Sequence, residues 1–147
     1  MSRRVFKAKI TGEAEIDAAF KALPDRVRLG VIDALKVIGL LIRNKAVAKI
    51  QAGPKTGRRY KRGSITHQAS APGEAPATDT GKLASSAEFE IDEQGLWAII
   101  SFSAFYAKIL EFGSRFIRPR PFLFASVDEN KLTVIEIFKQ SIKARLK

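Results

Sequence analysis

The densest group of side chains able to bind a charged ligand lies between residues 55 and 62. Its members surround one aromatic ring with cations: Lys55, Arg58, Arg59, Tyr60, Lys61 and Arg62. Cations can bind phosphate groups while a ring stacks on a base, so the pattern is compatible with contact to single-stranded nucleic acid. No helix-turn-helix, RNA-recognition signature or zinc finger is evident. Any such binding is therefore expected to ignore base sequence and to weaken with salt.

The charge of the whole chain points the same way. The net charge is +11 over 147 residues, and no acidic residue occurs between Asp33 and Glu74. A basic excess of this kind favours phosphate backbones or acidic protein surfaces as partners. A merely solvated basic face is the other interpretation, and the sequence leaves both open.

Groups suited to catalysis or metal binding are sparse. His67 is the one histidine and cysteine is absent, so no histidine–cysteine metal site can form. Ser70, His67 and Asp79 could be combined into a triad, but a flexible loop cannot hold the geometry that this chemistry needs. We interpret His67 as a solvated loop residue. We expect no enzymatic activity, no metal and no cofactor.

Hydrophobic periodicity predicts one α+β domain over residues 1–147. In the first third we expect a half-buried strand at Val5–Ile10, a helix at Glu13–Leu23 and a long helix from Pro24 to about Gln51. Gly30 and Gly39 inside the long helix suggest positions where another backbone comes close.

The pattern in the second half of the sequence predicts a small antiparallel sheet. We expect this sheet to pack against both the long helix and a C-terminal helix. Glu88–Ile91 and Leu96–Phe102 are expected to form a hairpin, whose second strand is apolar enough to be covered on both faces. A short helix is expected at Ala104–Glu111, ended by Gly113. A last helix is expected from Phe122 to the end of the chain, with basic residues in its final turns.

Residues 52–81 differ from the rest of the chain. They hold five glycines and three prolines, and among large apolar side chains only Tyr60 and Ile65. Such a segment cannot bury enough surface to offset the entropy of ordering it. We expect a long basic loop that is mobile in the free protein and becomes ordered against a partner or a neighbouring copy.

The segment from Ser103 to Ser126 is rich in aromatic residues and arginines. Since aromatic rings bury the most area per residue, we expect a core to be nucleated here. Pro119 and Pro121 keep the RPRP sequence extended and allow a helix to begin after it. The arginines of this corner are Arg115, Arg118 and Arg120.

Two stretches together resemble a known family. ASAPGEAPATDTGKLASS at 69–86, followed by FYAKILEFGSRFIRPRPFLFAS at 105–126, is similar to the tail-completion proteins of long-tailed bacteriophages and prophages, also called head–tail joining or neck proteins. The strand, long helix and basic loop that precede them fit as well, so the resemblance covers most of the chain. The matching residues are Ala71, Pro72, Gly73, Glu74, Pro76, Asp79, Thr80, Gly81, Leu83, Tyr106, Ala107, Leu110, Glu111, Phe112, Gly113, Arg118, Pro119, Arg120, Pro121 and Phe122.

The resemblance implies a small structural subunit of the virion neck, assembled in the bacterial cytoplasm. It would form a homo-oligomeric ring, six-fold to match a tail tube. Its partners would be the tail terminator or tail tube on one side and connector or stopper proteins on the other, with nonspecific contact to packaged DNA. The matched residues, including Glu74, Asp79, Glu111, Arg118 and Arg120, would have structural or interface roles. The alternative is a basic accessory protein that binds DNA without sequence preference and forms no ring.

Overall fold

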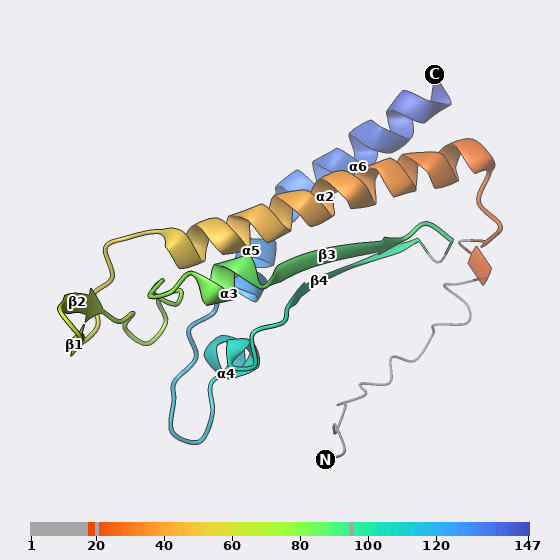
Figure 1. The fold of residues 1–147 in the computed structure, drawn as a ribbon. Helices are drawn as coiled ribbons and strands as arrows, with labels where there is room; N and C mark the ends of the chain where they lie inside the picture. The colour runs from red at the N-terminus through yellow and green to blue at the C-terminus, as the bar shows by residue number, and fades with distance from the viewer. Residues whose placement is uncertain (1–17, 20, 95) are drawn as a thin grey trace, which may run out of the picture.

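The computed structural model describes residues 18–19, 21–94 and 96–147. The expected strand at Val5–Ile10 and most of the expected helix at Glu13–Leu23 lie outside these residues. Within them the fold is α+β, as the periodicity predicts (Figure 1). The elements are α2 (Asp25–Gln51), β1 (Arg59–Arg62), β2 (Ile65–Gln68), α3 (Lys82–Ser85), β3 (Ala87–Asp92), β4 (Trp97–Phe102), α4 (Ala107–Phe112), α5 (Leu123–Glu129) and α6 (Lys131–Leu146).

Helix α2 is the long central element, and both its start after Pro24 and its end before Gly53–Pro54 agree with the prediction. The β3–β4 hairpin runs along α2, and α6 packs along it as well (Figure 1). Gly30 allows the backbone of α6 to come close, because a Cβ there would lie 2.8 Å from the Cα of Ile142. Gly39 makes room for the ring of Phe89, so its close neighbour is a side chain and not a backbone.

Strands β3 and β4 form an antiparallel pair whose two faces differ. Opposed residues point to the same side of a sheet. Phe89 and Ile100, which oppose each other, belong to the face packed toward α2, while Glu90 and Ile99 belong to the outer face. The prediction that the second strand is covered on both faces is wrong, because Trp97 is 45% exposed and Ile99 47% exposed.

Two hydrophobic clusters hold these elements together. Near the C-terminal end of α2, one joins Ile50 to α3, α4 and the start of α5, with Phe122 at its centre and only 2% exposed. Near the N-terminal end of α2, the other joins Val31 and Ile32 to Leu96 and to Phe138 and Ile142 of α6; its buried members are Val31, Ile32 and Leu96. The fold is thus fastened at both ends of its longest helix.

The C-terminal segment is two helices, so the prediction of one continuous helix from Phe122 is wrong. Asn130 leaves helical geometry with a φ of −109° and a ψ of 11°, and it separates α5 from α6. Its side-chain amide donates a hydrogen bond of 2.8 Å to the carbonyl of Ser126. Asparagine often replaces helical bonds with such local side-chain bonds, and here the bond accompanies the interruption between α5 and α6.

Part of the expected basic loop over residues 52–81 forms secondary structure, while its mobility in the free protein stays a prediction. Strands β1 and β2 pair antiparallel within it, with Tyr60 opposite His67 and Lys61 opposite Thr66. The pairing extends outward from the strands through a bond from the Gly57 amide to the Ala69 carbonyl. We call residues 57–69 the arm. It lies beyond the C-terminal end of α2 (Figure 1).

Among the helices of the described residues, none combines the length and the apolarity that crossing a membrane requires.

Candidate functional site

Glu74 fastens the base of the arm. Its carboxylate accepts a 2.6 Å bond from the Thr56 hydroxyl, a 3.1 Å bond from the Thr56 amide and a 2.8 Å bond from the Ala71 amide. These bonds stabilise the charged form, so the Thr56 hydroxyl, followed by the two amides, lowers the pKa of Glu74 below its ordinary value of 4.5. Residues on both sides of the arm are thereby tied to one side chain.

Asp79, which lies after the arm in the chain, binds both strands of the arm. One carboxylate oxygen lies 2.8 Å from Nη1 of Arg62 on β1, and the other lies 3.1 Å from Nε2 of His67 on β2. Tyr60 stacks on His67 with ring centroids 5.7 Å apart. The interpretation of His67 as a solvated loop residue is therefore wrong, since its side chain is only 18% exposed.

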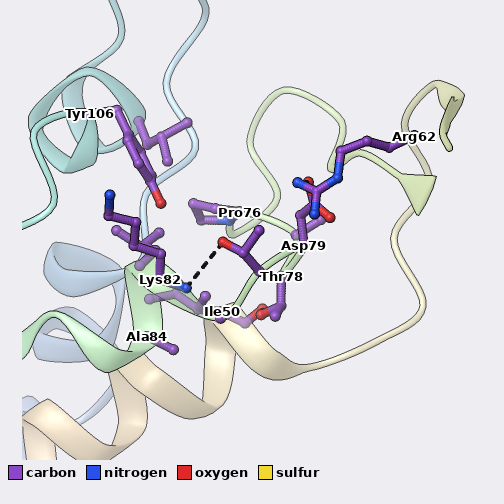
Figure 2. A pocket seen from close by; sticks show the side chains of 13 residues that line it. Ile50, Arg62, Pro76, Thr78, Asp79, Lys82, Ala84 and Tyr106 are labelled. Atoms are coloured by element: carbon purple, nitrogen blue, oxygen red, sulfur yellow. Dashed lines mark hydrogen bonds and ion pairs between the residues drawn. The ribbon is translucent and has the colours of Figure 1, made fainter. Parts of the chain in front are cut away.

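A pocket of about 460 Å³ lies between the arm, α3 and α4. Its floor is apolar and includes Ile50 and Leu83, while Arg62 and Asp79 form part of its polar rim. Figure 2 shows Tyr106 directing its hydroxyl toward Pro76 across this space. Both stretches that carry the family resemblance contribute to its wall, the first from Pro76 to Leu83 and the second through Tyr106 and Leu110.

Glu111 organises the corner before α5. It is 7% exposed, and its carboxylate accepts bonds from three successive backbone amides: Phe122 at 2.9 Å, Leu123 at 3.1 Å and Phe124 at 2.8 Å. The first amides of a helix lack partners within the helix, and a negative charge there is favourable. A side chain from α4 therefore caps α5, although Glu111 precedes Phe122 by eleven positions.

The loop between Gly113 and Pro121 is closed by its own backbone. Gly113 has a φ of +76°, a left-handed value that favours glycine, and a Cβ there would lie 2.7 Å from the Ile117 carbonyl. The Ser114 amide donates to that carbonyl at 2.7 Å. Outside the loop, the Gly73 amide donates a 3.0 Å bond to the Pro119 carbonyl. The two resemblance stretches therefore meet through their backbones.

Two of the three arginines of this corner, Arg118 and Arg120, differ in environment. The Arg120 amide donates a 2.7 Å bond to the Leu110 carbonyl, and the side chain is partly buried. Its Nε atom is buried and meets no acceptor among the described residues. Arg118 is exposed. Arg120 thus belongs to the corner itself, whereas Arg118 is available to another molecule.

The prediction that the aromatic residues of 103–126 nucleate a core is correct for Phe122 and wrong for most of the others. Phe105 is 85% exposed and Phe116 is 88% exposed. Phe112 and Phe124 touch edge to face, with centroids 5.5 Å apart, but both remain exposed. Composition shows that the rings are present, but it does not show whether a second layer covers them.

The predicted cations of residues 55–62 fall into two groups. Arg62 is bound to Asp79, and Lys55 donates a 3.0 Å bond to the Lys49 carbonyl at the end of α2. Arg58, Arg59 and Lys61 are exposed and form no ion pair within residues 18–19, 21–94 and 96–147. The sequence cluster is therefore split between groups that hold the fold and groups that face solvent.

Sequence reasoning missed two structural side chains. Ser126 is fully buried and its hydroxyl donates a 2.6 Å bond to the Phe122 carbonyl. His67 and Asp79 were considered together only as members of a catalytic triad that was rejected, so the ion pair between them in the arm was not predicted. Ser70 is buried as well, at 4% exposure, so it is not accessible to a substrate. In the described part of the chain, no three metal-binding side chains come together.

Comparison with family models, with curated proteins and with solved structures found no match for this chain.

Proposed function

We propose that this chain is a structural subunit of a bacteriophage neck, a tail-completion protein that works in a ring between the connector and the tail tube. The observation that carries the proposal is the meeting of the two stretches with family resemblance. They are joined by the bond from Gly73 to Pro119, and they share a wall of one pocket and one hydrophobic cluster. Glu74 and Glu111 each fasten one of the stretches through backbone amides. Residues of this kind shape a surface.

The exposed apolar surface also supports an assembly role. Isolated apolar side chains on a surface are ordinary, but contiguous patches are typical of interaction sites. Phe112 and Phe124 form such a patch beside a groove of about 200 Å³ that β4, α4 and α5 enclose. Leu132 at the start of α6 is 82% exposed. Contact with other copies, with a tail terminator or tail tube and with connector proteins would cover this surface.

The buried Ser70 and the two ion pairs of Asp79 argue against a catalytic triad of Ser70, His67 and Asp79. A nucleophile must be reachable, and the aspartate of such a triad binds and orients the histidine. Here Asp79 is shared between Arg62 and His67, and both belong to the arm. We assign this group to holding the arm in place.

DNA binding without sequence preference remains the second candidate function. It is favoured by the exposure of Arg59 and Lys61, which oppose Gln68 and Thr66 on the face of the arm away from Asp79. Contacts of this kind release counterions and weaken steeply as salt rises. Binding that persists at physiological salt, by a chain that never joins a particle, would favour this candidate.

Deletion of the gene from the phage or prophage that carries it tests the neck proposal. Electron microscopy of the resulting particles should show filled heads beside separate tails, and a plasmid copy should restore joined particles. Abnormal tail ends would distinguish tail completion from a stopper role. Joined, infectious particles in the absence of the gene would refute the proposal.

A further inference from the structure

The outer face of the β3–β4 sheet combines acidic and apolar groups. Glu88 and Glu90 lie exposed on β3, and neither forms an ion pair within the described residues. Across the strand pair, Ile99 opposes Glu90, and Trp97 lies next on the same face. A half-exposed tryptophan and isoleucine beside exposed carboxylates favour contact with an amphipathic, basic partner.

The arm offers the complementary surface. Arg59 and Lys61 stand two residues apart on one face of β1, as Glu88 and Glu90 do on β3. Side chains at positions i and i+2 of a strand are about 6.8 Å apart, so the two cations and the two carboxylates have the same spacing. The opposite face of the arm is already used, because Arg62 and His67 bind Asp79 there.

Within one chain, the arm lies apart from the outer face of the β3–β4 sheet. Bonds from Glu74 and Asp79 hold it beyond the C-terminal end of α2, whereas β3 begins after α3 and runs along that helix away from the arm (Figure 1). The two complementary surfaces therefore belong to different copies of the chain.

We propose that the cationic face of the arm, Arg59 and Lys61, docks on the outer sheet face of a neighbouring copy, against Glu88, Glu90 and Trp97. The inference rests on the proposed ring and names the contact that closes it. Because the arm and the sheet face are different surfaces, the contact is head to tail, and such contacts form rings when the rotation closes. The aliphatic stems of the cations pack on Trp97 while their charges meet the carboxylates.

Charge exchange in complemented deletion particles tests the docking. Arg59→Glu with Lys61→Glu, and separately Glu88→Lys with Glu90→Lys, should each lower the yield of joined particles at least tenfold. The chain with all four changes should recover to within about threefold of the wild type, since opposite charges again face each other. A matched reversal at an exposed site elsewhere, Glu136→Lys, should leave the yield unchanged.

Disulfide trapping gives a second measurement that does not depend on the reversed charges being tolerated. The chain has no cysteine. Particles that carry Lys61→Cys together with Glu88→Cys or with Glu90→Cys should give a ladder of linked copies after oxidation in at least one pairing. Lys61→Cys with Glu136→Cys should give none.

The outcomes separate the docking from the neck role. The protein could be present in particles while the variant with all four changes fails to restore the yield of joined particles and no ladder of linked copies forms. That result would overturn the docking and leave the proposed ring in place. The arm variant could lower the yield of joined particles without the sheet variant being able to restore it. That result would point to DNA as the partner of the arm and would also overturn the docking. Absence of the protein from all particles overturns both proposals.

Discussion

Removal of the Glu111 carboxylate is the sharpest test of how the corner before α5 is built. In Glu111→Ala the amides of Phe122, Leu123 and Phe124 lose their common acceptor. Loss of a capping side chain costs about 0.5–2 kcal/mol. An unsatisfied buried amide, here that of Phe122, costs about 1–3 kcal/mol more. Together these terms predict a loss of about 3 kcal/mol in the free energy of unfolding.

Urea unfolding followed by circular dichroism measures this loss. The midpoint should fall while the slope with denaturant stays the same, because the fold and its buried area are retained. Glu111→Gln should fall between the wild type and Glu111→Ala, since its amide keeps one acceptor oxygen. Glu136→Ala is the matched control. Glu136 is exposed and accepts a single 3.1 Å bond from Gln140, so the change should cost about 0.5 kcal/mol or less.

The refuting result is a Glu111→Ala midpoint that coincides with that of Glu136→Ala. The capping bonds would then contribute nothing net, and the corner would be held by Phe122 packing alone.

Three further predictions concern the arm and the packing on α2. The pKa of Glu74 in the folded protein lies below its ordinary value of 4.5, so its contribution to stability is present at neutral pH and is lost as the pH falls through the folded pKa. Carbon NMR of the Glu74 carboxyl should show a titration midpoint below 4.5, and a midpoint above 4.5 would contradict the hydrogen bonds described for Glu74. Gly39→Ala should lower the free energy of unfolding by about 1–3 kcal/mol, because the new Cβ overlaps the ring of Phe89, and Phe89→Leu in the same chain should recover part of this loss. If Gly39→Ala is as stable as the wild type, the Phe89 ring moves freely and the prediction is wrong. Asp79→Asn should increase the rate at which trypsin cuts the arm, since it weakens the bonds that hold both strands, whereas Asp128→Asn at an exposed helix pair should not; equal rates would remove Asp79 from its role.

Helix α2 could be predicted from the sequence because its apolar residues repeat every three to four positions and a Gly–Pro pair ends it. Each of these signals is local. The arm could not be predicted in the same way. β1 has no buried residue, so no apolar alternation identifies it, and its order depends on Glu74 and Asp79, which lie outside the strands. The family resemblance singled out both acids without revealing what they bind.

The aromatic residues of 103–126 show a second limit of prediction from sequence. Its rings were visible in the sequence, but burial depends on whether a second layer covers them, and within the described residues Phe105 and Phe116 have none. The role of Glu111 was likewise hidden, because the amides it caps come from a helix that begins only after the proline-containing loop. Long-range bonds of a carboxylate to backbone groups leave no periodic trace in a sequence.

We propose that this chain occupies the neck of a phage particle, and labelling of the particles tests that position directly. Gold particles bound to a tag placed after Lys147 should be seen by electron microscopy at the junction between head and tail, and on free tails at the head-proximal end. Gold along the whole tail, within the head or on no particle at all would contradict the claim.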